Sequence, residues 1–371
     1  MDIVCRHCNA TYTIADHKVP AQKAAATCKR CGNRIVIAPA TQPAVSEAAG
    51  STPPPRPAAT GSPAARRHSP DIVDAFPQLK DFDAARYDLS AILRPNRKGR
   101  YTTRLNRYKV KILTAVKPTL DRLLAKDETV LRIAGGTAYY PIELLFGNGF
   151  FTTLYNRYAL AATNRRLVMV NTNYRMTRTS HYLFQMPYEA VHKVSRGLFR
   201  SSLRLKRQTG GWRIFNALKR ASSAEMQAMI QSRLCADNNL KGAAPALENL
   251  CPACFEAAPS GAEACPACQA AFKGVGKAAL RSLLLPGWGD MYLGHRVLGA
   301  MELLGSLFVW LLVLSMILDG GSENLVVAGV ILVFYNGLDA LLTRHMARKG
   351  SMLEASRTSA HIGAQIATTP A

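Results

Sequence analysis

The chain has 371 residues, with 47 Lys and Arg against 24 Asp and Glu, and a formal net charge of +23. Hydrophobic residues make up 48% of the chain and charged residues 19%, which excludes a wholly disordered chain, a collagen-like fibre and a disulfide-dense miniprotein. The length predicts two or more domains. The basic excess points to an acidic partner: nucleic acid, an anionic membrane face or an acidic protein.

The first predicted unit, residues 1–37, contains two Cys-x-x-Cys pairs. Two thiolates three positions apart can hold one metal ion from a tight turn, and two such turns complete a tetrahedral Zn²⁺ site. A redox dithiol or disulfides are the alternatives, but the pairs come in twos and no βαβ pattern flanks them, which favours metal. The predicted ligands of this zinc ribbon are Cys5, Cys8, Cys28 and Cys31.

This unit resembles the prokaryotic "zinc finger/thioredoxin putative" family, whose members open with I-x-C-x-x-C-x-x-x-Y-x-I and close with C-x-x-C-G. The family name keeps a redox role open, and His7 departs from the pattern, either as a surface residue or as a spare ligand. Because so small a module has almost no core, metal binding would supply most of its folding free energy. The pattern falls on Ile3, Cys5, Cys8, Tyr12, Ile14, Val19, Pro20, Cys28, Cys31 and Gly32.

Residues 38–75 are predicted to be a linker. The stretch 38–70 has eight Pro, nine Ala and one large aliphatic residue, Val45, so it cannot bury enough apolar area to offset its ordering entropy. Residues 76–126 follow as a basic helical segment, in which 103–124 has an apolar stripe on one helical face. We favour packing of this stripe on the next domain over a helix lying in a membrane interface. The stripe comprises Leu105, Tyr108, Ile112, Val116, Leu120 and Leu123.

Two windows carry the whole net charge. Residues 94–126 contain eleven Lys and Arg and one acid, and residues 157–220 contain fourteen and one. A surface so short of acids repels itself without a partner, so we expect these windows to bind one rather than to be solvated faces.

Residues 127–236 are predicted to form a β-rich roll closed by a helix over Ala221–Cys235. Short runs rich in Val, Leu, Tyr and Phe, separated by Gly, Asn or Thr, predict the strands. Several strands followed by one helix indicate a small barrel or half-open roll capped by that helix. The predicted strands are Glu128–Ala134, Arg157–Ala162, Arg166–Thr172, His181–Met186, Leu198–Lys206 and Gly211–Phe215.

This block resembles the bacterial pleckstrin-homology-like domains. Residues 160–167, LAATNRRL, are similar to their LTNRRL strand-turn-strand, and residues 186–191, MPYEAV, are similar to their IPYEDI strand. The resemblance implies the fold more than a ligand. Such domains serve as adaptors for membranes or proteins, and no catalytic residues come with the resemblance.

Residues 237–272 contain Cys-Pro-Ala-Cys twice, separated by ten residues, and predict a second, shorter zinc ribbon. The proline helps to set each turn, and the donor set again favours Zn²⁺, which makes two expected zinc sites. The ninth cysteine, Cys235, is assigned no role. The predicted ligands of the second ribbon are Cys251, Cys254, Cys265 and Cys268.

A transmembrane hairpin is predicted over 297–345, with a tail over 346–371. The apolar runs Val297–Leu318 and Leu325–Thr343 are long enough to cross the hydrocarbon core; two buried helices of a soluble bundle are the alternative. The loop between them carries two acids and the outer flanks carry bases. The positive-inside rule therefore predicts an inner-membrane protein with both termini cytoplasmic and both basic windows beside the anionic leaflet. We expect no signal peptide.

The segment 273–296 is predicted to be interfacial or re-entrant, because Pro286 and the nearby glycines argue against a simple third helix. Residues 285–294, LPGWGDMYLG, resemble the start of the two-transmembrane-helix domains, and Asp339 matches an Asp near the end of that family's second helix. The second run has Phe334 and Tyr335 in place of the family's Trp pair.

Each apolar run contains one acid, Glu302 or Asp339. Intramembrane acids are candidates for an ion or proton site. The alternative, which we favour at this point, is that both side chains reach the interface or pair with Arg296 and Arg344.

No nucleophile–base pair, phosphate-cradling loop or paired acids in a cleft stands out, so we expect a chain that is not an enzyme. The sequence favours a multidomain, zinc-binding adaptor anchored in the inner membrane. The basic domain would face anionic inner-leaflet lipid, and the tethered ribbon would bind an unidentified protein partner; a homo-oligomer is possible. A membrane-tethered nucleic-acid-binding protein is the second choice, and a small transporter or channel subunit the third.

Overall fold

A computed structural model describes the ordered parts of the chain: residues 2–4, 11–13, 24–27, 34–37, 69–141, 143, 155–198, 200–236 and 247–354. The N-terminal unit contains two antiparallel strand pairs. Strand β1 (Asp2–Val4) pairs with β2 (Thr11–Thr13), and β3 (Ala24–Thr27) pairs with β4 (Arg34–Ile37).

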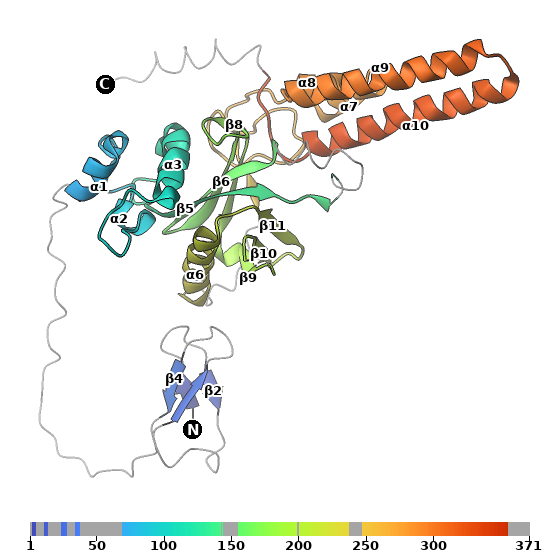
Figure 1. The fold of residues 1–371 in the computed structure, drawn as a ribbon. Coiled ribbons are helices and arrows are strands. Elements are labelled where there is room, and N and C mark those ends of the chain that lie inside the picture. The colour runs from blue at the N-terminus through green and yellow to red at the C-terminus, as the bar shows by residue number, and fades with distance from the viewer. Residues whose placement is uncertain are drawn as a thin grey trace, which may run out of the picture.

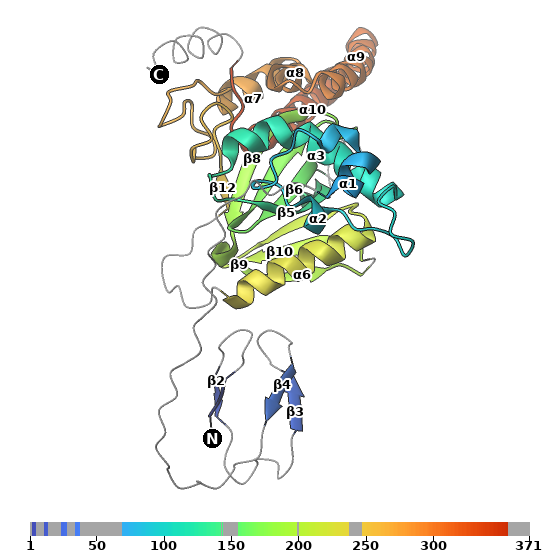
Figure 2. The ribbon, with the colours of Figure 1, turned by 90° about the vertical axis from the view of Figure 1, so that its left-hand side faces the viewer.

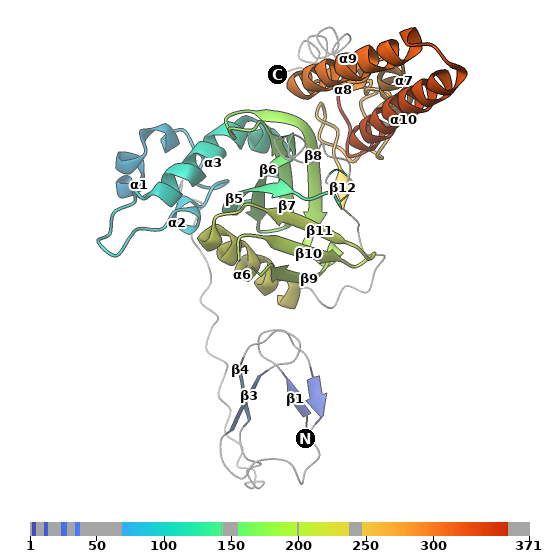
Figure 3. The ribbon, with the colours of Figure 1, turned by 45° about the vertical axis from the view of Figure 1, so that its right-hand side comes forward.

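An eight-stranded antiparallel sheet forms the centre of the molecule, in the order β12-β8-β7-β6-β5-β11-β10-β9 (Figure 3). The predicted strands are present, with two additions and one shift. Strands β9 and β12 were not predicted, and β10 begins at Leu203 because Gly197 pairs with Ser202 across a turn in which Arg200 has a φ of 55°. The strands are β5 (Val130–Ala138), β6 (Arg157–Thr163), β7 (Arg166–Thr172), β8 (Thr179–Pro187), β9 (Val191–Arg196), β10 (Leu203–Arg207), β11 (Trp212–Asn216) and β12 (Glu248–Asn249).

Both faces of the central strands are covered. Along β6, Ala159 and Ala161 lie in one apolar core, whereas Leu160 and Ala162 lie in the other. Side chains alternate between faces along a strand, so a strand buried on both sides reads as a continuous apolar run rather than as an alternating pattern.

Helix α3 (Arg104–Leu123) covers one face of the sheet, together with the short elements that precede it. Ile112, Val116 and Leu120 of the predicted stripe are buried against the sheet. The stripe therefore packs on the domain, as favoured above. The preceding elements are α1 (Pro70–Ala75), which lies within the range predicted as linker, the 3₁₀ turn η2 (Pro77–Leu79) and α2 (Leu89–Ile92).

Helix α6 (Arg220–Ala236) closes the other side, lying alongside β9 and β10 (Figures 2 and 3). Its Met226 and Ile230 are fully buried. Several strands followed by one closing helix is the arrangement predicted for this part of the chain.

Two long helices form a hairpin that extends away from the sheet, on the opposite side from α1 and α3 (Figure 1). Only 22% and 17% of their most apolar 18-residue windows are buried, whereas a core helix of a soluble protein is mostly buried. Both are long and apolar enough to cross a membrane. They are α9 (Arg296–Leu318) and α10 (Ser322–Ala347); α7 (Val275–Leu284) and α8 (Trp288–Leu293) lie at their base.

The sheet and the hairpin base share one apolar core. Tyr182 donates its hydroxyl to the carbonyl of Met346 at 2.9 Å, and the Leu298 N–H donates to the Tyr155 hydroxyl at 2.9 Å. The sheet domain is thus seated directly on the base of the hairpin.

Candidate metal centre

The second predicted zinc ribbon is the C-terminal ribbon, and its four cysteines, Cys251, Cys254, Cys265 and Cys268, form one cluster. The Sγ atoms of Cys251 and Cys268 are 3.8 Å apart, and those of Cys254 and Cys265 are 3.6 Å apart. All four lie within 4.8 Å of one another. A tetrahedral Zn²⁺ with Zn–S bonds of about 2.3 Å places its sulfurs about 3.8 Å apart. The donor set and its spacing therefore fit zinc.

The repeated Cys-Pro-Ala-Cys sequence folds into two equivalent turns. In the first, Phe255 N–H donates to the Cys251 carbonyl at 2.9 Å, and in the second Gln269 N–H donates to the Cys265 carbonyl at 2.9 Å. Phe255 and Gln269 both have a left-handed backbone, with φ of 65° and 58°. The same local sequence thus presents two thiols in the same way, which is what a shared metal site needs.

Backbone amides point at these sulfurs. The Ala253 N–H donates to Cys251 Sγ at 3.4 Å. Burial raises the pKa of Cys251 and raises that of Cys254 to about 11. Burial would also raise the pKa of Cys265, but amide hydrogen bonds from Cys268 and Ala267 and hydrogen bonds with the Cys254 and Cys251 thiols outweigh it and lower that pKa to about 7. Because the thiolate is the metal ligand, these amides favour the form that binds.

The C-terminal ribbon also joins three other parts of the molecule. Strand β12 enters it from the sheet edge, where Asn249 pairs with β8. On the far side, Lys273 N–H donates to the Met352 carbonyl at 2.8 Å, in the segment that follows α10. From α3, the Arg122 guanidinium donates to the Ala253 carbonyl at 3.1 Å.

The predicted ligands of the N-terminal ribbon lie outside the described residues, as does His7. These ligands are Cys5, Cys8, Cys28 and Cys31. The side chain of Cys235 also lies outside them.

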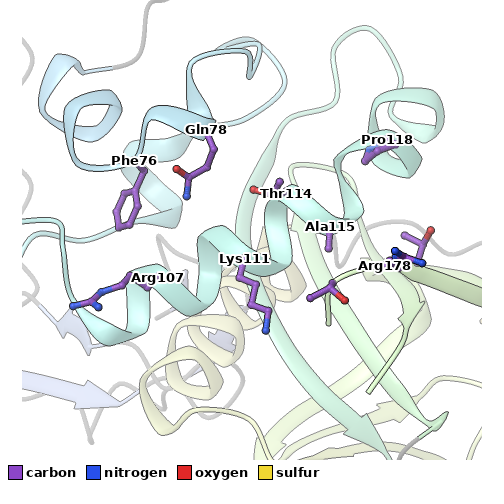
Figure 4. A pocket seen from close by; sticks show the side chains of 10 residues that line it. Phe76, Gln78, Arg107, Lys111, Thr114, Ala115, Pro118 and Arg178 are labelled. Atoms are coloured by element: carbon purple, nitrogen blue, oxygen red, sulfur yellow. The ribbon is translucent and has the colours of Figure 1, made fainter. Parts of the chain in front are cut away.

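A groove of about 740 Å³ opens between η2, α3 and the turn that joins β7 to β8 (Figure 4). Three of its lining residues are basic: Arg107 and Lys111 lie one turn apart on α3, and Arg178, from the turn before β8, lies near the Pro118 end of that helix. No acid is among the lining residues, and Phe76 and Pro118 add apolar surface. The groove suits an anionic ligand that also has apolar parts.

Three carboxylates form a separate cluster at the base of the hairpin. One carboxylate oxygen from each of Asp290, Glu302 and Asp339 lies within 4.8 Å of the others. The sequence had indicated Glu302 and Asp339, but not Asp290, which stands in the Pro-Gly-Trp-Gly-Asp segment before α9. The sequence signal for Asp290 is that this acid stands between Gly289 and Gly294 in a largely apolar segment.

Residues 1–36 match a family model described as a zinc-ribbon domain. The match covers the first two Cys-x-x-Cys pairs and supports zinc binding by this chain. No curated protein and no solved structure matches the chain. Its N-terminal unit is a zinc-ribbon domain, followed by an antiparallel sheet domain with a second Cys₄ cluster and by two helices that could span a membrane.

Proposed function

We propose that the chain is a non-enzymatic adaptor, anchored in the inner membrane by α9 and α10, that binds one zinc ion in each ribbon. The observation that supports it best is the core shared by the sheet and the hairpin base. Leu298 of α9 and Met346 of α10 are buried in the same cluster as Phe184 and Phe215 of the sheet. A domain fixed in this way holds its binding surfaces at a set position relative to the membrane.

The hairpin base carries groups suited to an anionic leaflet. Helix α7 exposes Leu280, Leu283 and Leu284, and Trp288 follows it with 45% of its surface exposed. An amphipathic helix with an exposed Trp fits the boundary between headgroups and acyl chains. Each nearby base adds about 1 kcal/mol of attraction to an anionic surface. The bases around the hairpin base are Lys273, Lys277, Arg281, Arg296, Arg344 and Arg348.

The basic groove supports a second contact, with an acidic protein partner. Helix α3 carries much of the first basic window, it packs in a different core from the one that the sheet shares with the hairpin base, and the hairpin extends away on the other side (Figure 1). That position favours a partner in the cytoplasm over lipid for this window, in contrast to the expectation from sequence. Arg107, Lys111 and Arg178 supply the complementary charge.

We also propose a fold type for the sheet domain and a role for the N-terminal ribbon. The order of strands and the closing helix α6 support a pleckstrin-homology-like domain over residues 127–236, in line with its LAATNRRL and MPYEAV segments. The N-terminal zinc ribbon, on its Pro- and Ala-rich linker, would extend the reach of the adaptor to a second protein site.

The anchor is tested by extraction of membranes that contain the full chain with alkaline carbonate. We expect the protein to stay in the membrane pellet, because two apolar helices insert in an effectively irreversible way. Recovery of most of the protein in the soluble fraction would overturn the anchor.

The partner is tested with the full chain in nanodiscs, using a fluorescent glutamate-rich peptide and a mixed single-stranded oligonucleotide at matched salt. We expect peptide binding that weakens as salt rises and that falls at least about tenfold in Arg107→Glu/Lys111→Glu, because two attractive charges become repulsive. Lys98→Glu, in the same basic window but outside the groove, is the control. Tighter binding of the oligonucleotide than of the peptide would instead favour a membrane-tethered nucleic-acid-binding protein.

A further inference from the structure

Three carboxylates from three different elements meet at the base of the hairpin. Asp290 belongs to α8, Glu302 to α9 and Asp339 to α10. Asp290 is 1% exposed and Asp339 is 7% exposed. The cluster lies where the two long helices and the segment before them join, so whatever it binds would connect all three.

Two glycines allow this convergence. Gly287 has a left-handed backbone with a φ of 83°, and a Cβ on it would overlap the Gly299 carbonyl of α9. A Cβ on Gly299 would in turn overlap the Gly287 carbonyl. The two backbones therefore approach closely, and this approach lets the Gly287 N–H donate to Asp339 Oδ2 at 3.0 Å.

The charge of Asp290 is only partly compensated by the protein. Its Oδ2 accepts a hydrogen bond from the Thr343 hydroxyl at 3.0 Å. Its Oδ1 is buried and, in the part of the chain that the structure describes, accepts no hydrogen bond from an amide, a hydroxyl or a basic side chain; the group beside it is the Glu302 carboxyl. Burying a carboxylate oxygen without such a donor costs several kcal/mol of free energy. A positive ligand would therefore lower the free-energy cost of burying Asp290.

The arrangement of the donors indicates what that ligand is. All the converging side chains offer oxygen, which is the donor that hard divalent cations prefer. Oxygens on opposite sides of a Ca²⁺ ion lie about 4.8 Å apart at a metal–oxygen distance of about 2.4 Å, and closer around Mg²⁺. The three carboxylates lie within 4.8 Å of one another, so they can reach one ion together.

We propose that Asp290, Glu302 and Asp339 bind one hard divalent cation, Ca²⁺ or Mg²⁺, at the base of the hairpin. The ion would link α8, α9 and α10 and so rigidify the surface on which the sheet domain is seated. The site uses none of the cysteines, and it does not depend on the adaptor role.

The test uses the full chain in nanodiscs, dialysed free of Ca²⁺ and Mg²⁺ and checked for retained zinc. Each cation is titrated separately, and bound metal per chain is counted by elemental analysis while Trp fluorescence is recorded, because Trp288 lies between Gly287 and Gly289 of the closely packed turn. We expect one saturable Ca²⁺ or Mg²⁺ per chain. Glu302→Gln and Asp339→Asn should each weaken binding at least about tenfold, since loss of even an indirect support costs that much at metal sites.

Asp319→Asn, which changes an exposed acid in the loop after α9, is the matched control and should bind as the unaltered chain does. Retained zinc in each variant shows that the protein is folded. Absence of saturable binding up to about 10 mM, well above the range of weak calcium modules, would overturn the proposal. Equal binding by the two variants and the unaltered chain would overturn it too. Stabilisation of the cation-free protein by a lower pH alone would also overturn it, because it would indicate a shared proton in place of a cation.

Discussion

At the scale of single residues, one feature of the sheet domain is an ion pair between a buried carboxylate and a partly buried arginine. Glu128 is 1% exposed, and its carboxylate accepts two hydrogen bonds from the Arg166 guanidinium, at 2.9 Å and 2.7 Å. The Thr163 hydroxyl adds a third at 2.8 Å. Arg166 and Thr163 both belong to the LAATNRRL segment, so this segment is held by its polar side chains as well as by its backbone turn.

Replacing Glu128 with Gln should lower the free energy of unfolding of the sheet by about 1.5–3 kcal/mol, because it removes charge-assisted hydrogen bonds to the partly buried Arg166, whose side chain is 21% exposed. Hydrogen exchange of the β5 and β6 amides measures this. Asp127→Asn is the control, since Asp127 pairs with Arg165 at the surface and such pairs contribute about 0–1 kcal/mol. Equal losses in the two variants would contradict this role of the buried pair.

The same carboxylate makes stability depend on pH. Burial alone would raise the pKa of Glu128, but the hydrogen bonds and charge of Arg166 outweigh burial and lower that pKa below its ordinary value of 4.5. The stabilisation is therefore complete above pH 4.5 and is lost as the pH falls through the lowered value. We expect protection of the β5 and β6 amides to fall below about pH 4.5, and to fall less in Glu128→Gln.

At the scale of secondary-structure elements, the hairpin base depends on residues without side chains. The Gly299 position faces the Gly287 carbonyl, and an added Cβ would also lie 2.7 Å from Met291 Cγ. Gly337 of α10, by contrast, has no atom within 4 Å of an added Cβ. Both glycines lie in long apolar helices, and they differ in how closely other atoms pack around them.

Gly299→Ala should destabilise the contact between α8 and α9 by about 1–3 kcal/mol, as overpacking usually does. Gly337→Ala should be neutral, or stabilising by up to about 1 kcal/mol, because alanine favours the helix. Thermal unfolding of the full chain in nanodiscs measures both. A loss in Gly337→Ala as large as that in Gly299→Ala would show that the close approach is not what matters.

At the scale of the whole molecule, the C-terminal ribbon connects the sheet to the hairpin. Asn249 pairs with the sheet edge and donates its side-chain amide to Ser351 at 2.6 Å, and the Glu354 N–H donates to the Ala271 carbonyl at 2.9 Å. A ribbon this small gains most of its folding free energy from its metal. Zinc in this ribbon would therefore fix how the domain sits on the membrane anchor.

Cys265→Ser should remove one zinc per chain, as counted by elemental analysis, and should speed hydrogen exchange over residues 248–272 and 350–354. Cys235→Ser, outside both predicted ligand sets, should keep the full zinc content and the slow exchange. Unchanged exchange in Cys265→Ser after loss of its zinc would show that the ribbon holds the two parts together without metal.

Local patterns in the sequence determined the units of this protein. Thiols three residues apart specify a turn that presents them together, as the equivalent turns at Cys251 and Cys265 show. Continuous apolar runs specify the two long helices, because their length and composition depend on no other part of the chain. The strand β9 escaped prediction because its short segment, Val191–Arg196, buries only Val191 and Val194.

The tertiary structure alone decided how these units meet. Asp290 joins Glu302 and Asp339 because two glycine backbones approach closely, and no sequence spacing encodes that approach. The placement of α3 on the side away from the hairpin likewise depends on which face of the sheet its apolar stripe covers. A pattern of residues specifies which face of an element is buried, but the partner that buries it is chosen by packing across the whole molecule.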